Sequence, residues 1–182
     1  MKRLAVIPAR AGSTRLKDKN VYPLAGQPLI RWITRAVVES GCFDKVIVST
    51  DSDKIFSAVQ DLNVERHYRP TEHATVKATP LNAMSMTEIP ETIQLACVMK
   101  ENWVMPVFDN LEAGLTNSKF IKKYYKPSGG FHMARWDKLL ESKNFFKGNV
   151  KGVLIPKERS IDIDDIHDIE MAEQLWHTRY VV

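Results

Sequence analysis

The fold of this chain is decided near its start, by residues 2–20, which read KRLAVIPARAGSTRLKDKN. Residues 2–7 form a short, mainly apolar run that predicts one buried strand. The polar loop that follows, residues 10–20, contains one glycine and four Arg or Lys side chains. Because ligands of open α/β sheets bind at the carboxyl ends of the strands, this stretch predicts a first strand that ends in an anion-binding loop.

The segments after this loop repeat the order helix, strand, helix, strand. A helix opens at Gln27-Pro28 and stops at Gly41, a second buried strand covers residues 45–50, a helix covers about 54–62, and a third strand covers 64–68. The stripe predicted to face the core of the first helix consists of Leu29, Ile30, Ile33, Ala36, Val37 and Val38. This order predicts a parallel sheet of right-handed βαβ units within a single α/β domain over residues 1–182.

The rest of the chain is predicted to mix strands, a hairpin and helices. Strands are expected at 83–88, 130–134 and 152–156, an extended hairpin at 93–99 and 103–108, a polar loop at 110–126, and helices at 135–142 and from about 165. The last helix is expected to turn five apolar side chains inward, namely Ile166, Ile169, Met171, Ala172 and Leu175.

The composition excludes several classes of protein. The net charge of +4 favours anionic ligands, but the cations are spread along the chain and no nucleic-acid module is recognised, so no nucleic-acid partner is expected. No apolar run approaches the roughly 18 residues of a membrane span, and the start is too short for a signal peptide, so we expect a cytoplasmic protein. Cys42 and Cys97 lack metal-ligand spacing and are interpreted as buried or idle thiols.

The residue types of the loop suit phosphate. Arg10 and Arg15 offer forked donors, and Lys19 offers a point charge. Gly12 allows a ligand close to the backbone, and Ser13 adds a hydroxyl. Neither a Walker A loop nor G-x-G-x-x-G is present, and a solvated basic loop is the alternative interpretation.

A second informative stretch is Ser160-Ile161-Asp162-Ile163-Asp164-Asp165. On an extended backbone Asp162 and Asp164 point the same way, and two carboxylates on one face suit Mg²⁺. Nucleotidyl transfer uses such an ion to offset phosphate charge. Helix capping by Asp165 and Asp168 is the alternative, but it does not explain Asp162.

Together these stretches resemble a known family. The residues 7–20, 24–30, 43–51, 68–72 and 158–164 resemble, in order, the motifs of acylneuraminate cytidylyltransferases, also called CMP-sialic acid synthetases, with their legionaminic and pseudaminic acid relatives. The resemblance implies a Rossmann-like nucleotide-diphospho-sugar transferase fold. Such a fold has a mostly parallel sheet, three layers and an extended dimerisation arm, which here corresponds to about residues 85–126.

The resemblance also implies roles for individual residues. The nucleotide-binding positions are Arg10, Gly12, Ser13, Arg15, Lys19, Asn20 and Arg69. The metal positions are Asp162 and Asp164, which with Arg10 and Lys19 form the catalytic set. The sugar-side positions are Ser128, Gly129, His132, Phe145 and Phe146, where Ser128 and His132 replace an asparagine and a tyrosine of the family pattern.

One segment departs from the family pattern. After Ala74 the sequence passes almost directly to Ser85, so about 50 residues, more than one βαβ unit, are expected to be missing. The missing strand would lie beside the first strand of the sheet, whose edge would then need another partner. The arm is expected to make a homodimer, and burial of the same residues within one subunit is the alternative.

The function implied is the transfer of CMP from CTP to a nine-carbon, sialic-acid-like sugar, with Mg²⁺ as cofactor and CMP-sugar and pyrophosphate as products. A trimmed homologue of weak or no activity, which binds nucleotide or dimerises, is the alternative. The shortened segment and the replaced residues Ser128 and His132 favour that alternative.

Overall fold

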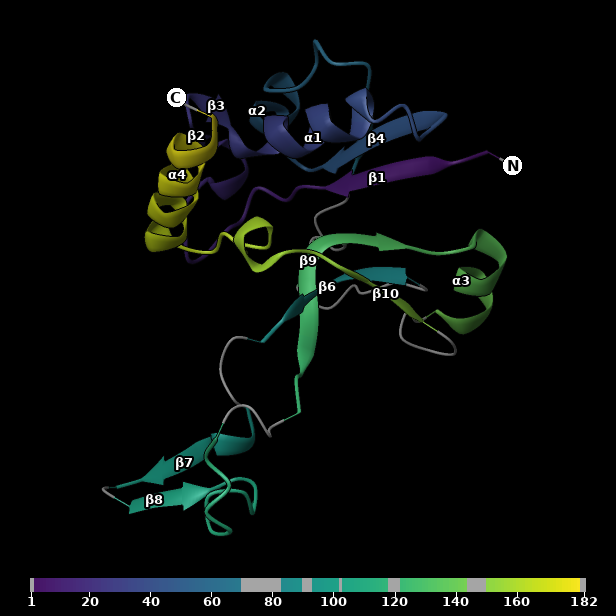
Figure 1. Cartoon of the computed structure of the whole chain (residues 1–182). Helices are drawn as coiled ribbons and strands as arrows, with labels where there is room; N and C mark the ends of the chain where they lie inside the picture. The colour runs from purple at the N-terminus through teal and green to yellow at the C-terminus, as the bar shows by residue number, and fades with distance from the viewer. Residues whose placement is uncertain are drawn as a thin grey trace. The chain divides into compact units, whose positions relative to one another are not determined.

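The computed structural model describes residues 2–69, 83–89, 93–101, 103–117, 122–143 and 150–180 (Figure 1). The chain divides into two compact units, Met1–Ala78 with Ile163–Val182, and Thr79–Asp162. We describe each unit by itself. The single domain expected over residues 1–182 stays a prediction.

The first unit is built on a parallel sheet in the order β1-β4-β5. Its strands are β1 (Leu4–Pro8), β4 (Lys45–Thr50) and β5 (Glu65–Tyr68). The helices α1 (Leu29–Glu39) and α2 (Asp53–Ser57) lie over one face of this sheet (Figure 1). The core between these layers consists of Ala5, Ile7, Ala9, Ile30, Val46, Val48, Ile55 and Val59. The parallel βαβ arrangement predicted from the sequence is confirmed.

The stripe predicted for α1 is partly wrong. Ile33 is exposed and so is Ala36, whereas Thr34 is fully buried. Thr34 tolerates burial because its hydroxyl donates to the carbonyl of Ile30, 2.6 Å away, which satisfies the polar group inside the core. The end of the helix is as predicted, since Gly41 has a φ of 61°, a backbone conformation that favours glycine.

A tight turn precedes α1, and a side-chain cap starts α2. The strands β2 (Pro23–Leu24) and β3 (Gln27–Pro28) pair as a tight turn before α1. The helix α2 is shorter than predicted, and its first turn is capped by Ser52, whose side chain accepts the N–H of Ile55.

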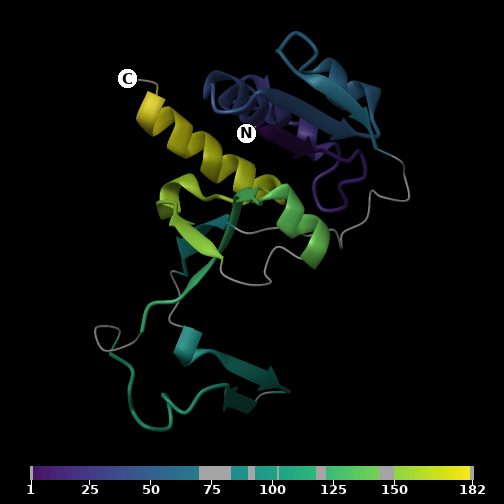
Figure 2. The same ribbon diagram turned by 90° about the vertical axis from the view of Figure 1, so that its right-hand side faces the viewer.

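The helix α4 (Ile166–Tyr180) completes the first unit as one uninterrupted helix (Figure 2). The ring of its Trp176 lies 4.4 Å from that of Trp32 on α1. Ile169 is buried as predicted, but Ile166 and Met171 are exposed, so the apolar stripe predicted for this helix is wrong at those two positions.

The second unit contains a mixed sheet in the order β10-β6-β9. The central β6 (Ala83–Glu88) pairs parallel with β10 (Lys151–Leu154) and antiparallel with β9 (Tyr125–Met133). The helix α3 (Trp136–Ser142) follows β9, and its Leu139 packs in the small cluster around Met84. The strand β9 starts at Tyr125, five residues before the predicted start, so the loop expected to extend to residue 126 was wrong at its end.

A hairpin also belongs to the second unit. It consists of β7 (Cys97–Lys100) and β8 (Trp103–Pro106), preceded by the 3₁₀ turn η3 (Ile93–Leu95), and confirms the predicted hairpin. Cys97 on β7 and Cys42 in the first unit are both free and exposed, so of the two interpretations, buried or idle thiols, burial is wrong and idle thiols stay a prediction.

Two further expectations concerned a membrane span and the edge of the first strand. No helix within the described ranges is both long and apolar enough to cross a bilayer. Among the described strands β1 pairs only with β4, so its other edge has no described partner strand. Residues 70–82, which contain most of the segment expected to be shortened, lie outside the described residues.

Candidate functional site

Hydrogen bonds fix the loop after β1 at both of its ends. At its start, the N–H of Ala9 donates to Ser49 O on β4 over 2.9 Å, and the N–H of Ala11 donates to Asp51 Oδ1 over 2.8 Å. At its end, Asn20 Nδ2 donates to the carbonyl of Arg10 over 2.8 Å. The loop is therefore closed on itself and held at the carboxyl end of β4, where a parallel sheet presents ligands.

Further contacts hold the middle of the loop. Leu16 is buried. Asp18 has a left-handed φ of 57°, and its carboxylate forms an ion pair with Lys54 on α2 over 2.7 Å. These contacts fix the backbone of the loop that carries the cationic side chains.

Two of the loop cations meet one carboxylate. Lys19 Nζ lies 3.0 Å from Asp164 Oδ1, and Arg15 Nη2 lies 2.6 Å from Asp164 Oδ2. The side chain of Arg15 is 70% exposed, whereas Lys19 and Asp164 are 28% and 31% exposed. Each carboxylate oxygen of Asp164 thus takes one cation.

The backbone that carries Asp164 is held by the start of α4. Asp168 Oδ2 accepts the N–H groups of Asp164 and Asp165 over 2.7 and 2.9 Å, and Asp165 Oδ1 accepts the N–H of Asp168 over 3.1 Å. This reciprocal pattern confirms the capping predicted for Asp165 and Asp168. The N–H groups of Asp164 and Asp165, and to a smaller extent Lys19 and Arg15, lower the pKa of the Asp168 carboxyl below its ordinary value of 3.8.

The remaining predicted nucleotide-binding residues differ in burial and in contacts. Arg10 is half-buried and makes no ion pair within the described part of the chain, and Ser13 is also half-buried. A Cβ at Gly12 would meet nothing within 4 Å, so the space beside that residue is open. Asn20 supports the loop through the carbonyl of Arg10, which is a positioning contact. Arg69 is half-buried at the end of β5, where its N–H donates to Thr50 O over 3.0 Å.

The predicted sugar-side residues and Asp162 belong to the second unit. Gly129 has a φ of 74°, and a Cβ added there would lie 3.9 Å from Oδ2 of Asp162, whose side chain is exposed. The hydroxyl of Ser128 is buried and has no hydrogen-bond partner among the described residues. Desolvation lowers the pKa of His132 below its ordinary value of 6.5, so its imidazole is neutral at pH 7. Phe145 and Phe146 lie outside the described residues.

The described residues therefore bring Arg15, Lys19 and Asp164 together, and separately bring Gly129 and Asp162 together. No group of three or more His, Cys, Asp or Glu side chains suited to a metal gathers within the described ranges. The sequence predicted Asp168 as a cap but missed Asp51 as a support of the loop. An acid directly after a neighbouring parallel strand is the signal that points to Asp51.

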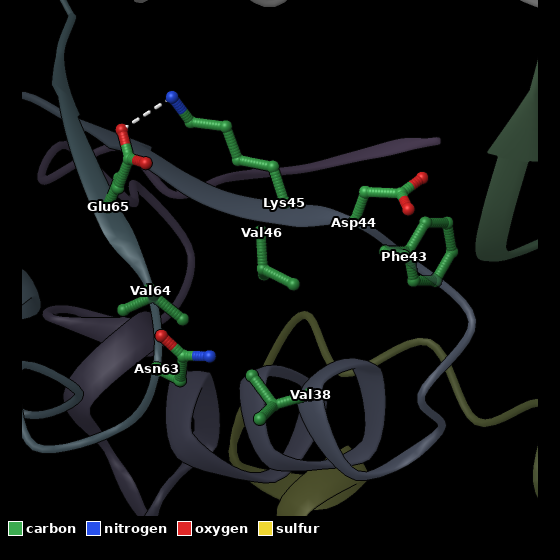
Figure 3. A pocket seen from close by; sticks show the side chains of 8 residues that line it. All are labelled: Val38, Phe43, Asp44, Lys45, Val46, Asn63, Val64 and Glu65. Carbon is green, nitrogen blue, oxygen red and sulfur yellow. Dashed lines mark ion pairs between the residues drawn. The ribbon is translucent and has the colours of Figure 1, made fainter. Parts of the chain in front are cut away.

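A small cavity of about 150 Å³ lies elsewhere in the first unit (Figure 3). It is lined by Val38, Phe43, Asp44, Lys45, Val46, Asn63, Val64 and Glu65. Lys45 begins β4 and pairs with Glu65 over 2.6 Å. The cavity thus sits at the amino ends of β4 and β5, the opposite end of the sheet from the loop.

Comparisons with known proteins show which fold and which relatives the chain resembles. The solved structure of CMP:2-keto-3-deoxy-manno-octonic acid synthetase complexed with CTP superposes with a TM-score of 0.53 at 16% identity. The match covers 98% of this chain and 99% of the other, and at that identity it shows the fold alone. The N-acylneuraminate cytidylyltransferase of Escherichia coli O18:K1:H7 is 29% identical over 94% of this chain. The chain spans about half, 51%, of that relative's length.

A second relative matches from end to end. The pseudaminic acid cytidylyltransferase of Campylobacter jejuni is 25% identical over 99% of this chain and 98% of its own length. That alignment spans 229 positions, whereas the chain has 182 residues, so at least 47 positions of the alignment have no counterpart here. This deficit is close to the about 50 residues expected to be missing from the sequence pattern.

The match to a family profile covers the same elements that build the loop and its sheet. Residues 4–101, more than half of the chain, match the profile described as cytidylyltransferase. This range starts with β1 and includes every described contact of the loop except those to residues of the segment before α4. The chain therefore belongs to the cytidylyltransferase family.

Proposed function

We propose that the protein transfers CMP from CTP to a nine-carbon sugar acid of the sialic-acid type and releases pyrophosphate. The observation that carries this proposal is the loop of residues 9–20, which supports three cationic side chains, Arg10, Arg15 and Lys19, at the carboxyl end of a parallel sheet. Relatives named for N-acylneuraminate and for pseudaminic acid support the class of sugar acid. Which acid is preferred is a matter for a substrate panel.

The chemistry asks mainly for positioning and charge stabilisation. The anomeric hydroxyl of the sugar acid attacks the α-phosphorus of CTP and loses its proton. The bond from that phosphorus to the bridging oxygen breaks, and pyrophosphate leaves. Arg10 and Lys19, assigned here to the phosphate oxygens, offset the negative charge that spreads over these oxygens during transfer. Gly12, Ser13, Arg15 and Asn20 complete the proposed phosphate site, with Arg69 near the nucleotide.

A magnesium ion fits this proposal only as a partner of the nucleotide. Mg²⁺ is commonly held by one or two carboxylates and completes its shell with water and substrate phosphates. Asp162 and Asp164 would supply two carboxylates, and no group of three or more His, Cys, Asp or Glu side chains suited to a metal occurs among the described residues. When bound, the ion would neutralise charge on the phosphates. Asp164 is engaged by Arg15 and Lys19, so it becomes a metal ligand only after giving up these cations.

The sugar side is proposed at Ser128, Gly129 and His132. Within the described ranges the buried hydroxyl of Ser128 is a donor without a partner, and a buried group of this kind is stabilised when a ligand satisfies it. Neutral His132 has one donor and one acceptor nitrogen for sugar hydroxyls, and we do not assign it a role as a base. Phe145 and Phe146 remain predictions for the same side.

A homodimer formed through the arm, about residues 85–126, belongs to the same proposal. The hairpin in this range exposes several large apolar side chains, namely Val98, Met99, Trp103, Val104, Met105, Val107 and Phe108. A large exposed apolar patch is typical of a protein–protein contact. The cytoplasmic location expected from the sequence stays a prediction.

A trimmed protein that binds nucleotide or dimerises without turnover is the second candidate. The edge of β1 that has no described partner strand, together with the deficit of aligned positions, favours it. The two candidates differ in one measurement, the release of pyrophosphate.

The test is a pyrophosphate-release assay with CTP, Mg²⁺ and a panel of N-acetylneuraminic, legionaminic and pseudaminic acids. We expect turnover with at least one acid and a loss of about 100-fold in kcat/KM for Lys19→Ala, the effect typical of removing one charge-stabilising donor. Lys17→Ala is the matched control, because Lys17 is exposed on the same loop and makes no ion pair among the described residues. CTP binding without turnover would favour the second candidate. Absence of CTP binding by the folded protein would contradict the transferase and the nucleotide-binding form of the second candidate, and would leave only dimerisation.

A further inference from the structure

The contact between the loop and Asp164 has a consequence for how a nucleotide enters the site. Resting on the function proposed above, we propose that Asp164 is an internal stand-in for phosphate, which holds Arg15 and Lys19 in the nucleotide-free protein and must be displaced by the triphosphate. The exchange makes Asp164 a positioning residue in the free protein and releases its carboxylate for a cation in the bound one.

The geometry is that of an anion bound by two donors. Oδ1 of Asp164 takes Lys19 over 3.0 Å, and Oδ2 takes Arg15 over 2.6 Å. A phosphate group presents oxygens to Arg and Lys in the same way, so carboxylate and phosphate compete for the same side chains. Lys19 and Arg15 keep further N–H donors, so the two anions compete for the charge and the position of these side chains rather than for every donor.

The stand-in is held in place from behind. Asp168 accepts the N–H of Asp164 over 2.7 Å, and α4 itself is attached to the first unit through Glu173, whose Oε1 accepts the N–H of Ala25 over 3.3 Å. The carboxylate of Asp164 is therefore delivered by a structured helix start. It occupies the cations before any ligand does.

The competition lowers the affinity for a nucleotide without a metal. A ligand that needs a minor state binds more weakly by the fraction of molecules in that state. Here the minor state is the one in which Asp164 has left Arg15 and Lys19. Released Asp164 is then an unpaired carboxylate, and a divalent cation that arrives with the triphosphate gives it a new partner. Nucleotide and cation therefore favour each other's binding.

The two cations are expected to differ in this exchange. Arg15 is largely exposed, so salt screens its pair with Asp164, and such surface pairs contribute little. Lys19 is mostly covered, so salt screens its pair with Asp164 less. This pair therefore accounts for most of the competition with phosphate. Added salt should therefore weaken the competition only in part.

A purely structural role for Asp164 predicts the opposite sign. If Asp164 only fixed the cations, its removal would loosen Arg15 and Lys19 and weaken the binding of any phosphate ligand. If Asp164 competes, its removal frees both cations and tightens binding in the absence of metal. The direction of the change separates the two roles.

The experiment is isothermal titration of the intact protein with CTP, and separately with inorganic pyrophosphate, in EDTA and then with Mg²⁺. For Asp164→Asn we expect metal-free affinity to rise about threefold to tenfold, the size of one or two partly exposed ion pairs. The gain in affinity on adding Mg²⁺ should be smaller for this variant than for the wild type. Glu39→Gln removes one negative charge from an exposed side chain at the end of α1, whose ion pair is with Arg35 and not with the loop, and it should leave the metal-free affinity unchanged.

A second measurement uses the wild type, in case Asp164→Asn fails to fold. Carbodiimide labelling with mass spectrometry reports how accessible each carboxylate is. Metal-free pyrophosphate should increase the labelling of Asp164 and leave Asp162 unchanged, whereas labelling of Asp164 that stays constant in the pyrophosphate-bound protein overturns the exchange.

The outcomes separate this inference from the proposed function. Unchanged or weaker metal-free binding by folded Asp164→Asn overturns the exchange, even if the wild type turns over CTP. If the wild type binds pyrophosphate but no CTP, the proposed function fails while the pyrophosphate arm still tests the exchange.

Discussion

The strands β1 and β6 differ in the exposure of their side chains in a way that their sequences do not predict. The strand β1, LAVIP, is the more apolar, yet its Leu4 and Val6 are 51% and 53% exposed. The strand β6, AMSMTE, carries two hydroxyl side chains, yet Met84, Ser85 and Thr87 are all buried. The more polar strand is thus the better covered of the two.

The reason lies in what surrounds each strand. Alternation turns the side chains of Leu4 and Val6 to the face opposite the core, where they are half exposed. The strand β6 pairs with β10 on one edge and β9 on the other, whereas β1 pairs only with β4 among the described strands. The carbonyl of Arg3 and the N–H of Ala9 bond to β4 residues, so alternation directs the peptide groups of Leu4 and Val6 to the other edge. Parallel strands are normally covered on both faces. The open edge of β1 is where the segment missing from the family pattern is expected.

The largest expected effect compares core truncations in the two strands. Met84→Ala should lower the free energy of unfolding by about 2–4 kcal/mol, because it empties a buried site. Leu4→Ala should cost less than about 1 kcal/mol, because half of that side chain already contacts water. Urea unfolding measures both. Equal losses would mean that β1 is covered as fully as β6 and would break the comparison.

A medium effect is expected from the hydroxyl in the buried strand. Ser85 Oγ accepts the N–H of Phe131 over 3.0 Å, so Ser85→Ala leaves that N–H without a partner. The expected cost is about 1–3 kcal/mol, the penalty for an unsatisfied buried group. Thermal unfolding of Ser85→Ala beside Ser57→Ala, an exposed serine of α2, measures it. A shift no larger than that of the control would show that the hydroxyl does not stabilise β6.

The smallest effect is expected on the open face of β1. Val6→Thr keeps the shape and adds a hydroxyl that water can reach, so the free energy of unfolding should change by less than about 0.5 kcal/mol. The same substitution at fully buried Val48 on β4 should cost about 1–3 kcal/mol. Both are measured by urea unfolding. A large loss for Val6→Thr would reveal a partner on that face of β1, such as a second subunit.

Much of the fold follows from local pattern. Strand β4 and strand β6 begin and end where the apolar runs predict, and Asp165 and Asp168 form the predicted cap, since these features depend on near neighbours in the chain. Exposure was harder to predict. Ile33 turns outward while Thr34 turns inward, because the side of a helix that meets the sheet is decided by packing.

The candidate site divides in the same way. The sequence by itself determined the family, the loop of cations after the first strand, and the acids before the last helix. Only the tertiary structure decided that Lys19 and Arg15 meet Asp164, about 145 residues further along the chain. An ion pair depends on the distance in space between its charged groups. These groups come together only when α4 has packed against the rest of the first unit.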